Sequence, residues 1–307
     1  METGLIIKTT GSLHTVKSGR STFNCKIKGN YRIKGIKTTN PVTVGDMVDF
    51  YQENPGETGW ITHIHERKNY IIRRSINLSK EAHLLAANID QAFLITSLTM
   101  PETPLEFIDR FLITAEAYHI ITKLIFNKID LYDKVKLEYL NQLETMYSRI
   151  GYECIETSAY TGVNIERLKQ AMQNKTTLVA GNSGVGKSTL INCIDPKLNL
   201  KIDAISEYHK TGKHTTTFSE MFELEQGGYI IDTPGIKGFG IIDFEQQEVG
   251  HFFPEIFKMS EKCQFYNCTH THEPNCAVRK AVEEQKIASS RYRSYTNILF
   301  DNNNKYR

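Results

Sequence analysis

The stretch Gly181-Asn182-Ser183-Gly184-Val185-Gly186-Lys187-Ser188 matches the phosphate-binding loop pattern G-x-x-x-x-G-K-[ST]. It follows a short apolar run, Thr177–Ala180, and opens a run with helical character. Glycines in such a loop let backbone N–H groups surround a phosphate at a helix N-terminus. We therefore expect Lys187 to contact the β- and γ-phosphates of a nucleotide and the Ser188 hydroxyl to ligate Mg²⁺, with Thr189 beside them. This strand-and-helix context argues against a chance Gly-rich turn.

A second motif predicts which base the nucleotide carries. In the run Asn127-Lys128-Ile129-Asp130, the Asp130 carboxylate can accept from N1–H and the 2-amino group of guanine, and adenine offers neither donor there. Asn127 is expected on the other edge of the base and Lys128 against the ring. The backbone of Ser158 and Ala159 is expected to face the guanine O6. These residues predict GTP rather than ATP.

The order of the motifs is unusual. The run Asp232-Thr233-Pro234-Gly235, expected to reach Mg²⁺ through Asp232 and to sense the γ-phosphate through Gly235, follows the phosphate loop, but the guanine motifs precede it. The chain therefore reads as a circularly permuted P-loop GTPase.

The hydrolytic machinery is less complete. Ile236 stands where many GTPases carry a water-orienting glutamine. Gly212–Thr217 is the expected first switch, in which Thr216 or a neighbouring threonine completes the Mg²⁺ shell. His214 is a candidate to position water, although a structural or solvent-facing role stays open. The predicted catalytic set is His214, Lys187 and Thr216.

Composition places the chain among ordinary globular proteins. Its 307 residues suggest two or three domains, and 40% hydrophobic with 23% charged residues is typical of a soluble protein. No apolar run approaches the roughly 20 residues that span a bilayer, and the N-terminus lacks the features of a signal peptide. We expect a cytoplasmic protein with no membrane association, and a monomer because no coiled-coil seam is present.

Residues 1–72 are expected to form a small β-barrel such as an OB-fold, because short alternating runs are separated by turn residues. Residues 1–70 hold ten Lys/Arg against six Asp/Glu, a weak indication of nucleic-acid binding. A three-residue loop at Gly29-Asn30 would pair Lys28 with Arg32 and Lys26 with Lys34. The resulting cationic face would either follow a phosphate backbone or be merely solvated.

Residues 73–240 alternate strand and helix signals, as an α/β nucleotide domain should. Ala92–Leu98 and Lys123–Phe126 are expected as buried strands. Between them, Thr103 is expected to cap a helix with Pro104 at its first position, and Glu106 and Asp109 to favour its N-terminal end. The apolar residues at helical spacing that should face the sheet are Leu105, Ile108, Leu112 and Ala115.

Residues 241–307 are mostly helical in character around a cysteine cluster. The spacing Cys263-x4-Cys268-x-His270-x5-Cys276 supplies three thiolates and an imidazole, a closed tetrahedral set suited to one structural Zn²⁺. His272 is a competing fourth ligand. This region is therefore predicted to be a zinc-binding domain.

The arrangement resembles the RsgA family (also called YjeQ or YloQ), bacterial GTPases of small-subunit maturation. The resemblance rests on the permuted order, the cysteine block with Glu273-Pro274, Asp109-Arg110-Phe111-Leu112 and Arg291-Tyr292-x-Ser294-Tyr295. It implies an OB-fold, a permuted GTPase domain and a zinc domain. It also implies small-subunit rRNA as partner, GTP hydrolysis stimulated by the subunit, and release with GDP. Asn275 and Gln285 stand where the family leads us to expect glycine.

Two other interpretations stay open. One is a permuted GTPase that serves the large subunit, although relatives of that kind lack this pairing of barrel and zinc cluster. The other is an RNA-binding or metal-handling module that uses GTP only as a conformational ligand, which Ile236 keeps open.

Overall fold

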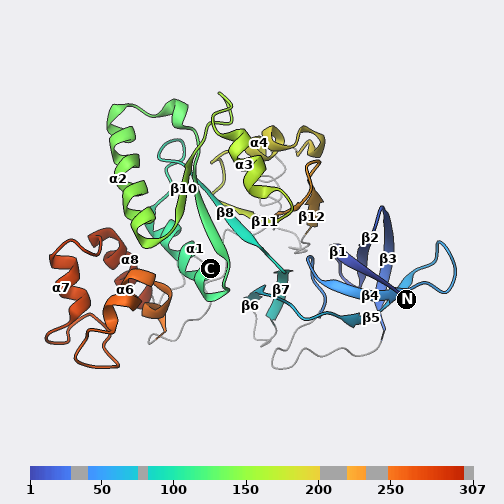
Figure 1. The fold of residues 1–307 in the computed structure, drawn as a ribbon, viewed down its shortest axis with the longest axis horizontal. Helices are drawn as coiled ribbons and strands as arrows, with labels where there is room; N and C mark the ends of the chain where they lie inside the picture. Colours follow the sequence, from blue (N-terminus) through green and yellow to red (C-terminus); the bar gives the residue numbers. More distant parts are fainter. Residues whose placement is uncertain (29–40, 75–81, 201–219, 233–247, 301–307) are drawn as a thin grey trace, which may run out of the picture.

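The structure is a computed structural model of the chain, and it describes residues 1–28, 41–74, 82–200, 220–232 and 248–300. These residues form an N-terminal β-barrel, a central sheet with helices on both faces, and a helical C-terminal unit (Figure 1). The barrel and the C-terminal unit lie at opposite ends of the molecule in this view.

The barrel closes because its fourth strand pairs back with its first. Its strands are β1 (Glu2–Thr10), β2 (Leu13–Ser18), β3 (Ser21–Ile27), β4 (Met47–Tyr51) and β5 (Gly59–Ile64), paired in the order β1-β2-β3-β5-β4-β1. Alternate side chains fill the interior, among them Ile6, Val16 and Phe50. The small β-barrel expected from the short alternating runs is therefore present. The loop expected at Gly29-Asn30, with the pairing of Lys28 to Arg32 and Lys26 to Lys34, falls outside the described residues.

The central sheet has the order β10-β9-β8-β11-β13-β12. Five of its strands are parallel and β12 runs antiparallel to β13. All six residues of β8 are buried, which explains why this strand reads as a continuous apolar run. The strands are β8 (Gln91–Thr96), β9 (Ile121–Phe126), β10 (Glu153–Glu156), β11 (Thr176–Ala180), β12 (Glu220–Glu223) and β13 (Tyr229–Asp232).

Helices cover the two faces of this sheet with separate cores. On one face, α1 (Leu105–Ala117) and α2 (Lys134–Ile150) contribute Ile108, Leu112 and Leu143. On the other face lie α3 (Ile165–Met172) and α4 (Lys187–Ile194). The short 3₁₀ helices η1 (Ile129–Leu131) and η2 (Pro196–Leu198) complete this part.

The start of α1 corrects one expectation. Pro104 is the N-cap and the helix begins at Leu105, so Thr103 does not cap it. The Thr103 hydroxyl instead accepts from the backbone N–H of Ser97, 3.1 Å away. Asp109 is also not a solvent-facing charge that favours the helix end, since only 1% of it is exposed.

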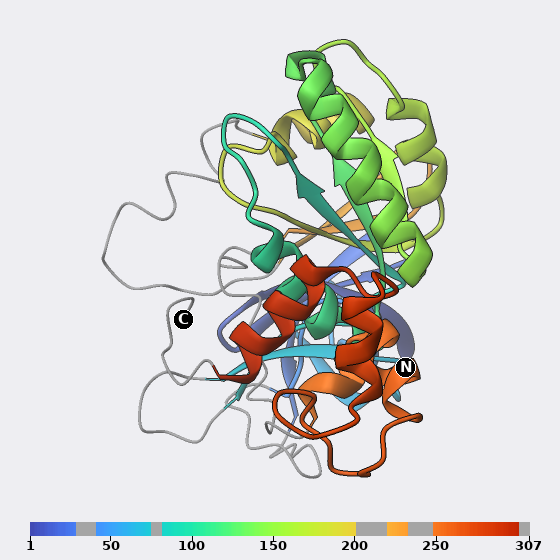
Figure 2. The same ribbon diagram turned by 90° about the vertical axis from the view of Figure 1, so that its left-hand side faces the viewer.

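The remaining elements join the sheet to the two ends of the molecule. β6 (Tyr70–Arg74) and β7 (Ala82–Ala87) form a small antiparallel sheet between the barrel and the central sheet. The C-terminal unit contains η4 (Val249–Phe252), α6 (Pro254–Ser260), α7 (Ala277–Glu283) and α8 (Ser289–Leu299), which face the viewer in Figure 2. Its core includes Ile113 of α1, so the unit packs directly on the nucleotide domain.

Candidate functional site: a nucleotide-binding edge and a metal-ligand cluster

The carboxyl ends of four parallel strands bring the sequence motifs together. β11 leads into Gly181, β9 into Asn127, β10 into Thr157, and β13 ends at Asp232. Because neighbouring parallel strands end at the same edge of a sheet, the four motifs gather there. The motifs therefore lie at one edge of the sheet although their order along the chain is permuted.

The phosphate loop requires glycine at two positions. Gly181 has φ +146° and a Cβ there would lie 2.2 Å from the carbonyl oxygen of Ile95; Gly186 has φ +95° and a Cβ there would lie 2.5 Å from Asn127 Nδ2. Lys187 Nζ donates to the carbonyl oxygens of Gly181 (2.7 Å) and Asn182 (2.8 Å). The ammonium group is thereby held over the loop whose N–H groups would bind phosphate.

Asn127 connects the phosphate loop to the guanine motifs. It is 1% exposed, and its Nδ2 donates to the carbonyl oxygen of Val185 at 2.8 Å. Its Oδ1 accepts from the N–H of Ala159 at 3.3 Å. Lys128, in the left-handed region with φ 66°, donates to the Gly184 carbonyl oxygen at 2.7 Å. Both side chains therefore fix the loop as well as facing the place expected for the base.

Asp130 lies at the outer end of this group. Its Oδ1 accepts from the Ser158 hydroxyl at 2.5 Å, and Ser158 is fully buried. The same hydroxyl accepts from the N–H of Thr161 at 3.0 Å. The carboxylate is therefore oriented before any ligand binds, which reduces the entropic cost of binding a base.

Not every predicted site residue can be placed. Asp232 ends β13 at the same edge, but its side chain lies outside the described part. The same holds for the whole of Gly212–Thr217, with His214, Thr215, Thr216 and Thr217, and for Gly235 and Ile236. Their predicted roles stay predictions.

The C-terminal unit brings four metal-ligand side chains together. Cys263, Cys268, His270 and Cys276 offer ligand atoms that all lie within 4.8 Å of one another. Cys263 Sγ lies 3.9 Å from Cys276 Sγ and 3.6 Å from His270 Nδ1. Tetrahedral Zn²⁺ with bonds near 2.3 Å to sulfur and 2.0 Å to nitrogen requires separations of about 3.8 and 3.5 Å. The cluster therefore has the dimensions and the donors to bind one zinc ion.

The histidine that joins the three cysteines of this cluster is His270, and not His272. His272 is exposed and its Nδ1 faces the Thr271 hydroxyl at 2.9 Å. Glu273 organises this loop by accepting from the N–H of Thr269 at 2.6 Å and of Thr271 at 3.0 Å. Burial raises the pKa of Glu273, but these hydrogen bonds outweigh it and hold the pKa at about 2. No role for this carboxylate could be inferred from the sequence beyond its place in the Glu273-Pro274 pair.

Comparison with known proteins decides the family. Residues 64–242 match the model of the RsgA GTPase and residues 3–61 that of the RsgA N-terminal domain. The chain belongs to the RsgA GTPase family. It is 55% identical over 306 residues to the small ribosomal subunit biogenesis GTPase RsgA of Bacteroides fragilis, and 56% identical over 307 residues to that of Phocaeicola vulgatus. Each alignment covers 99% of this chain and 98% of the relative.

Solved structures of the RsgA family share the whole fold. YjeQ from Thermotoga maritima superposes with a TM-score of 0.80 at 35% identity, covering 98% of each chain. The circularly permuted GTPase YloQ superposes with a TM-score of 0.75 at 31% identity, covering 98% of this chain and 94% of that one. The expected resemblance and the expected fold class, including the permuted nucleotide domain, are confirmed.

Helix α8 explains two of the motifs on which the expected resemblance to the RsgA family rested. Arg291 is fully buried and donates to Asp109 of α1 and to Glu255 of α6, each at 2.7 Å. Burial alone would lower the pKa of Arg291, but these two carboxylates raise it and keep the guanidinium charged. The hydroxyls of Tyr292 and Tyr295 donate to backbone carbonyls of the metal-ligand loop, each at 2.7 Å. One helix therefore fastens the cysteine cluster to the nucleotide domain.

The two departures from the RsgA family pattern have a backbone explanation. Asn275 has φ 55° and Gln285 has φ 57°, the left-handed region in which glycine costs least. Asparagine tolerates this region better than most residues. The backbone conformation at both positions is therefore one for which glycine is the least costly residue.

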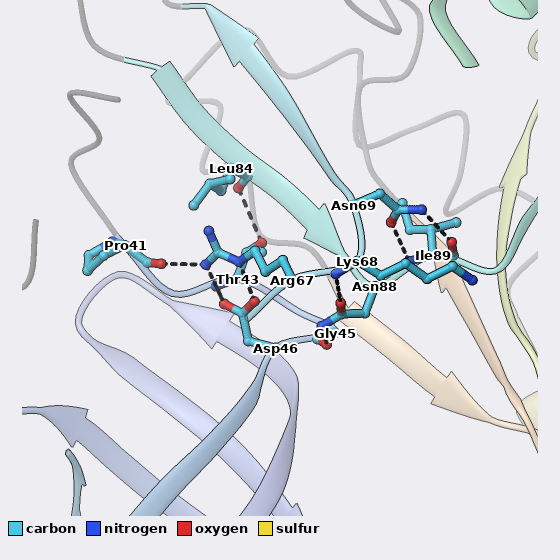
Figure 3. Close-up of polar contacts among 10 residues, drawn as sticks. All are labelled: Pro41, Thr43, Gly45, Asp46, Arg67, Lys68, Asn69, Leu84, Asn88 and Ile89. Carbon is cyan, nitrogen blue, oxygen red and sulfur yellow. Dashed lines mark hydrogen bonds and ion pairs between the residues drawn. The ribbon is translucent and has the colours of Figure 1, made fainter. Parts of the chain in front are cut away.

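The barrel joins the nucleotide domain through a buried polar junction (Figure 3). Arg67 donates to Asp46 through Nε at 2.6 Å and through Nη2 at 2.7 Å. Asn88 Nδ2 donates to the Gly45 carbonyl oxygen at 2.8 Å, and Asn69 bonds both the N–H and the carbonyl of Ile89 at 2.8 Å. The amides of Asn69 and Asn88 therefore link the two domains, and the bidentate Asp46–Arg67 ion pair holds the barrel side of this contact in a fixed orientation.

The barrel also extends the central sheet. Lys8 of β1 pairs with Glu220 of β12, and their side chains form an ion pair at 2.9 Å. Lys17 of β2 bonds Glu223 at the other end of β12. β12 and β13 form the hairpin that ends at Asp232, so the barrel contacts the element that carries this motif.

Among the residues that the structure describes, no helix combines the length and apolar composition needed to cross a membrane.

Proposed function

We propose that this chain is a GTPase that acts in late maturation of the small ribosomal subunit, hydrolysing GTP to GDP and phosphate. The observation that carries the proposal is the direct bond between Asn127 and Val185. It joins the guanine motif to the phosphate loop at the edge where the parallel strands end. Relatives 50–56% identical over nearly the whole chain are named small ribosomal subunit biogenesis GTPases.

In the proposed complex, guanine lies against Asp130. The carboxylate that now accepts from Ser158 would also accept from N1–H and the 2-amino group of the base. Lys187 would exchange its two carbonyl partners for the β- and γ-phosphates. Ser188 lies at the start of α4 and is 6% exposed. Its hydroxyl would ligate Mg²⁺ together with Thr216. Bound Mg²⁺ would offset negative charge on the phosphates.

The proposed hydrolysis depends on the small subunit. Ile236 cannot orient an attacking water, so the intrinsic rate is expected to be slow. We assign the water-positioning role to His214, brought into place when the subunit binds. The protein would then leave the subunit carrying GDP.

The other parts of the chain have supporting roles in this proposal. One Zn²⁺ on Cys263, Cys268, His270 and Cys276 would hold the C-terminal loop, and the barrel would bind rRNA. We propose that the chain works as a cytoplasmic monomer with domains 1–72, 73–240 and 241–307.

The test is GTP turnover with and without purified small ribosomal subunits, with large subunits as the control. We expect stimulation by the small subunit alone. Asp130→Asn is the matched variant, because an amide cannot accept both guanine donors; it should lose GTP affinity while the fold is unchanged. Stimulation by the large subunit alone would favour the large-subunit interpretation. A rate that no ribosomal particle changes would contradict the proposal and leave a GTP-gated binding protein.

A further inference from the structure

The C-terminal unit exposes an unusual number of aromatic rings in one short segment. The described residues include six exposed Phe or Tyr side chains, and three of them are Phe257, Phe265 and Tyr266. Tyr266 is fully exposed and the two phenylalanines are 46% and 41% exposed. Leaving three rings in water forgoes the free energy of burying them. Such a concentration is typical of a binding surface.

Two of these rings, Phe265 and Tyr266, line a pocket. This cavity of about 200 Å³ is also lined by Asn267 and by His251 of η4. The His251 ring packs edge-on against Phe257, with ring centroids 5.3 Å apart. We call His251, Phe257, Phe265, Tyr266 and Asn267 the aromatic surface. Its loop lies on the outer side of the C-terminal unit in both Figure 1 and Figure 2.

The polar groups of the aromatic surface are unused. No hydrogen bond joins the Asn267 amide, or either ring nitrogen of His251, to another residue of the described part, and both residues are exposed. An amide offers a donor and an acceptor in one plane, which suits the edge of a nucleobase. The neighbouring rings offer faces on which a base can stack.

Two lysines lie next in sequence to the rings of the aromatic surface. Lys258 and Lys262 are exposed and make no ion pair within the described residues, with Glu261 the one acidic residue between them. Protein–protein interfaces are depleted in lysine. Free lysines beside exposed rings instead match a charged backbone that carries aromatic bases. The charge pattern therefore favours RNA over a protein segment.

We propose that the aromatic surface binds an unpaired nucleobase of single-stranded RNA, stacked on Tyr266 and read at its edge by Asn267. The proposal rests on the proposed function, because that function supplies the RNA as part of the small ribosomal subunit. Zinc binding and the surface are linked through the chain, since Cys268 and His270, two of the cluster's ligands, also line the pocket.

The experiment measures binding of the full zinc-loaded chain to a short single-stranded RNA that carries one 2-aminopurine, with the same sequence as a duplex for comparison. Tyr266→Ala should weaken single-stranded binding about tenfold and abolish the quenching of 2-aminopurine. Tyr266→Phe should keep both, and Tyr266→Leu should lose both, because stacking needs a ring. Tyr139→Ala, which removes an exposed ring on α2, is the matched control. Zinc content and basal GTP turnover should be unchanged throughout.

Each outcome of this experiment either supports or overturns the RNA-binding proposal. Wild-type binding and quenching in Tyr266→Ala would overturn the proposal. If Tyr266→Ala bound free RNA as well as the wild type does but no longer bound the intact subunit, the proposal would also be overturned. A protein of the subunit would then be the occupant of the aromatic surface. This assay needs no ribosome, so failure of subunit-stimulated turnover in the wild type would count against the proposed function alone.

Discussion

His14 makes the stability of the barrel depend on pH. The residue is fully buried on β2, and neither ring nitrogen has a hydrogen-bond partner within the described residues. Its cross-strand neighbours are Thr9 and Cys25, and burial raises the pKa of the Cys25 thiol to about 11. Neither neighbour can therefore compensate a charge on the imidazole at neutral or mildly acidic pH.

The size of the effect follows from the pKa. Burial lowers the pKa of His14 from 6.5 to about 4. The unfolded chain therefore takes up a proton at a higher pH than the folded chain, and stability is lost as pH falls below 6.5. At 1.36 kcal/mol per pKa unit the full loss is about 3 kcal/mol, reached near pH 4, and about 2 kcal/mol of it falls between pH 7 and pH 5.

The chain contains one tryptophan, Trp60, and it lies on β5 of the barrel. Urea unfolding followed by Trp60 fluorescence at pH 7 and pH 5 therefore reports on the barrel. Between pH 7 and pH 5, the free energy of unfolding should fall by about 2 kcal/mol more in the wild type than in His14→Leu. His65→Gln, which removes an exposed barrel histidine paired with Asp49 at 2.9 Å, should behave like the wild type. Equal losses in the wild type and His14→Leu would refute the argument.

Three further results are expected. Lys187→Ala should reduce subunit-stimulated GTP turnover about 100-fold or more in a folded protein, and normal turnover would show that the phosphate site is misassigned. Arg291→Ala should lower the free energy of unfolding by about 3–5 kcal/mol, because Asp109 and Glu255 lose a buried partner. Thermal unfolding of the wild type and of this variant measures the difference. Chelation of zinc should increase amide hydrogen exchange across residues 248–300 without loss of GTP binding, and absence of zinc from protein purified under reducing conditions would contradict this.

Local patterns were enough to predict the strands β8, β9 and β11 and the helices α1 and α4 of the nucleotide domain. The phosphate loop and the guanine motif each depend on a few neighbouring residues whose chemistry is specific, so their position at strand ends could be inferred. The cysteine cluster was predictable for the same reason, since its ligands lie within 14 residues. The start of α1 was wrong by one residue, because the Thr103 hydroxyl bonds Ser97 across a loop.

Long-range pairing could not be predicted. Asp109 and Arg291 are 182 residues apart, and the sequence offered no reason to pair them although both lie in motifs on which the expected resemblance rested. A charged residue near a helix start is usually solvated, so the helix-end interpretation of Asp109 was the simpler one. The ion pair of Asp46 with Arg67 could not be predicted either, because each residue taken alone is most simply interpreted as a solvated surface charge.

The contact between β1 and β12 has a consequence for truncated forms of the protein. With the barrel in place, Lys8 and Glu220 cover the outer edge of β12. A chain shortened to the nucleotide domain and the C-terminal unit would leave that edge with unpaired N–H and C=O groups, which can pair with another copy. Such a fragment would tend to aggregate for reasons unrelated to RNA. The barrel thus also protects an edge of the sheet, and loss of activity on removing it cannot be attributed to lost RNA binding alone.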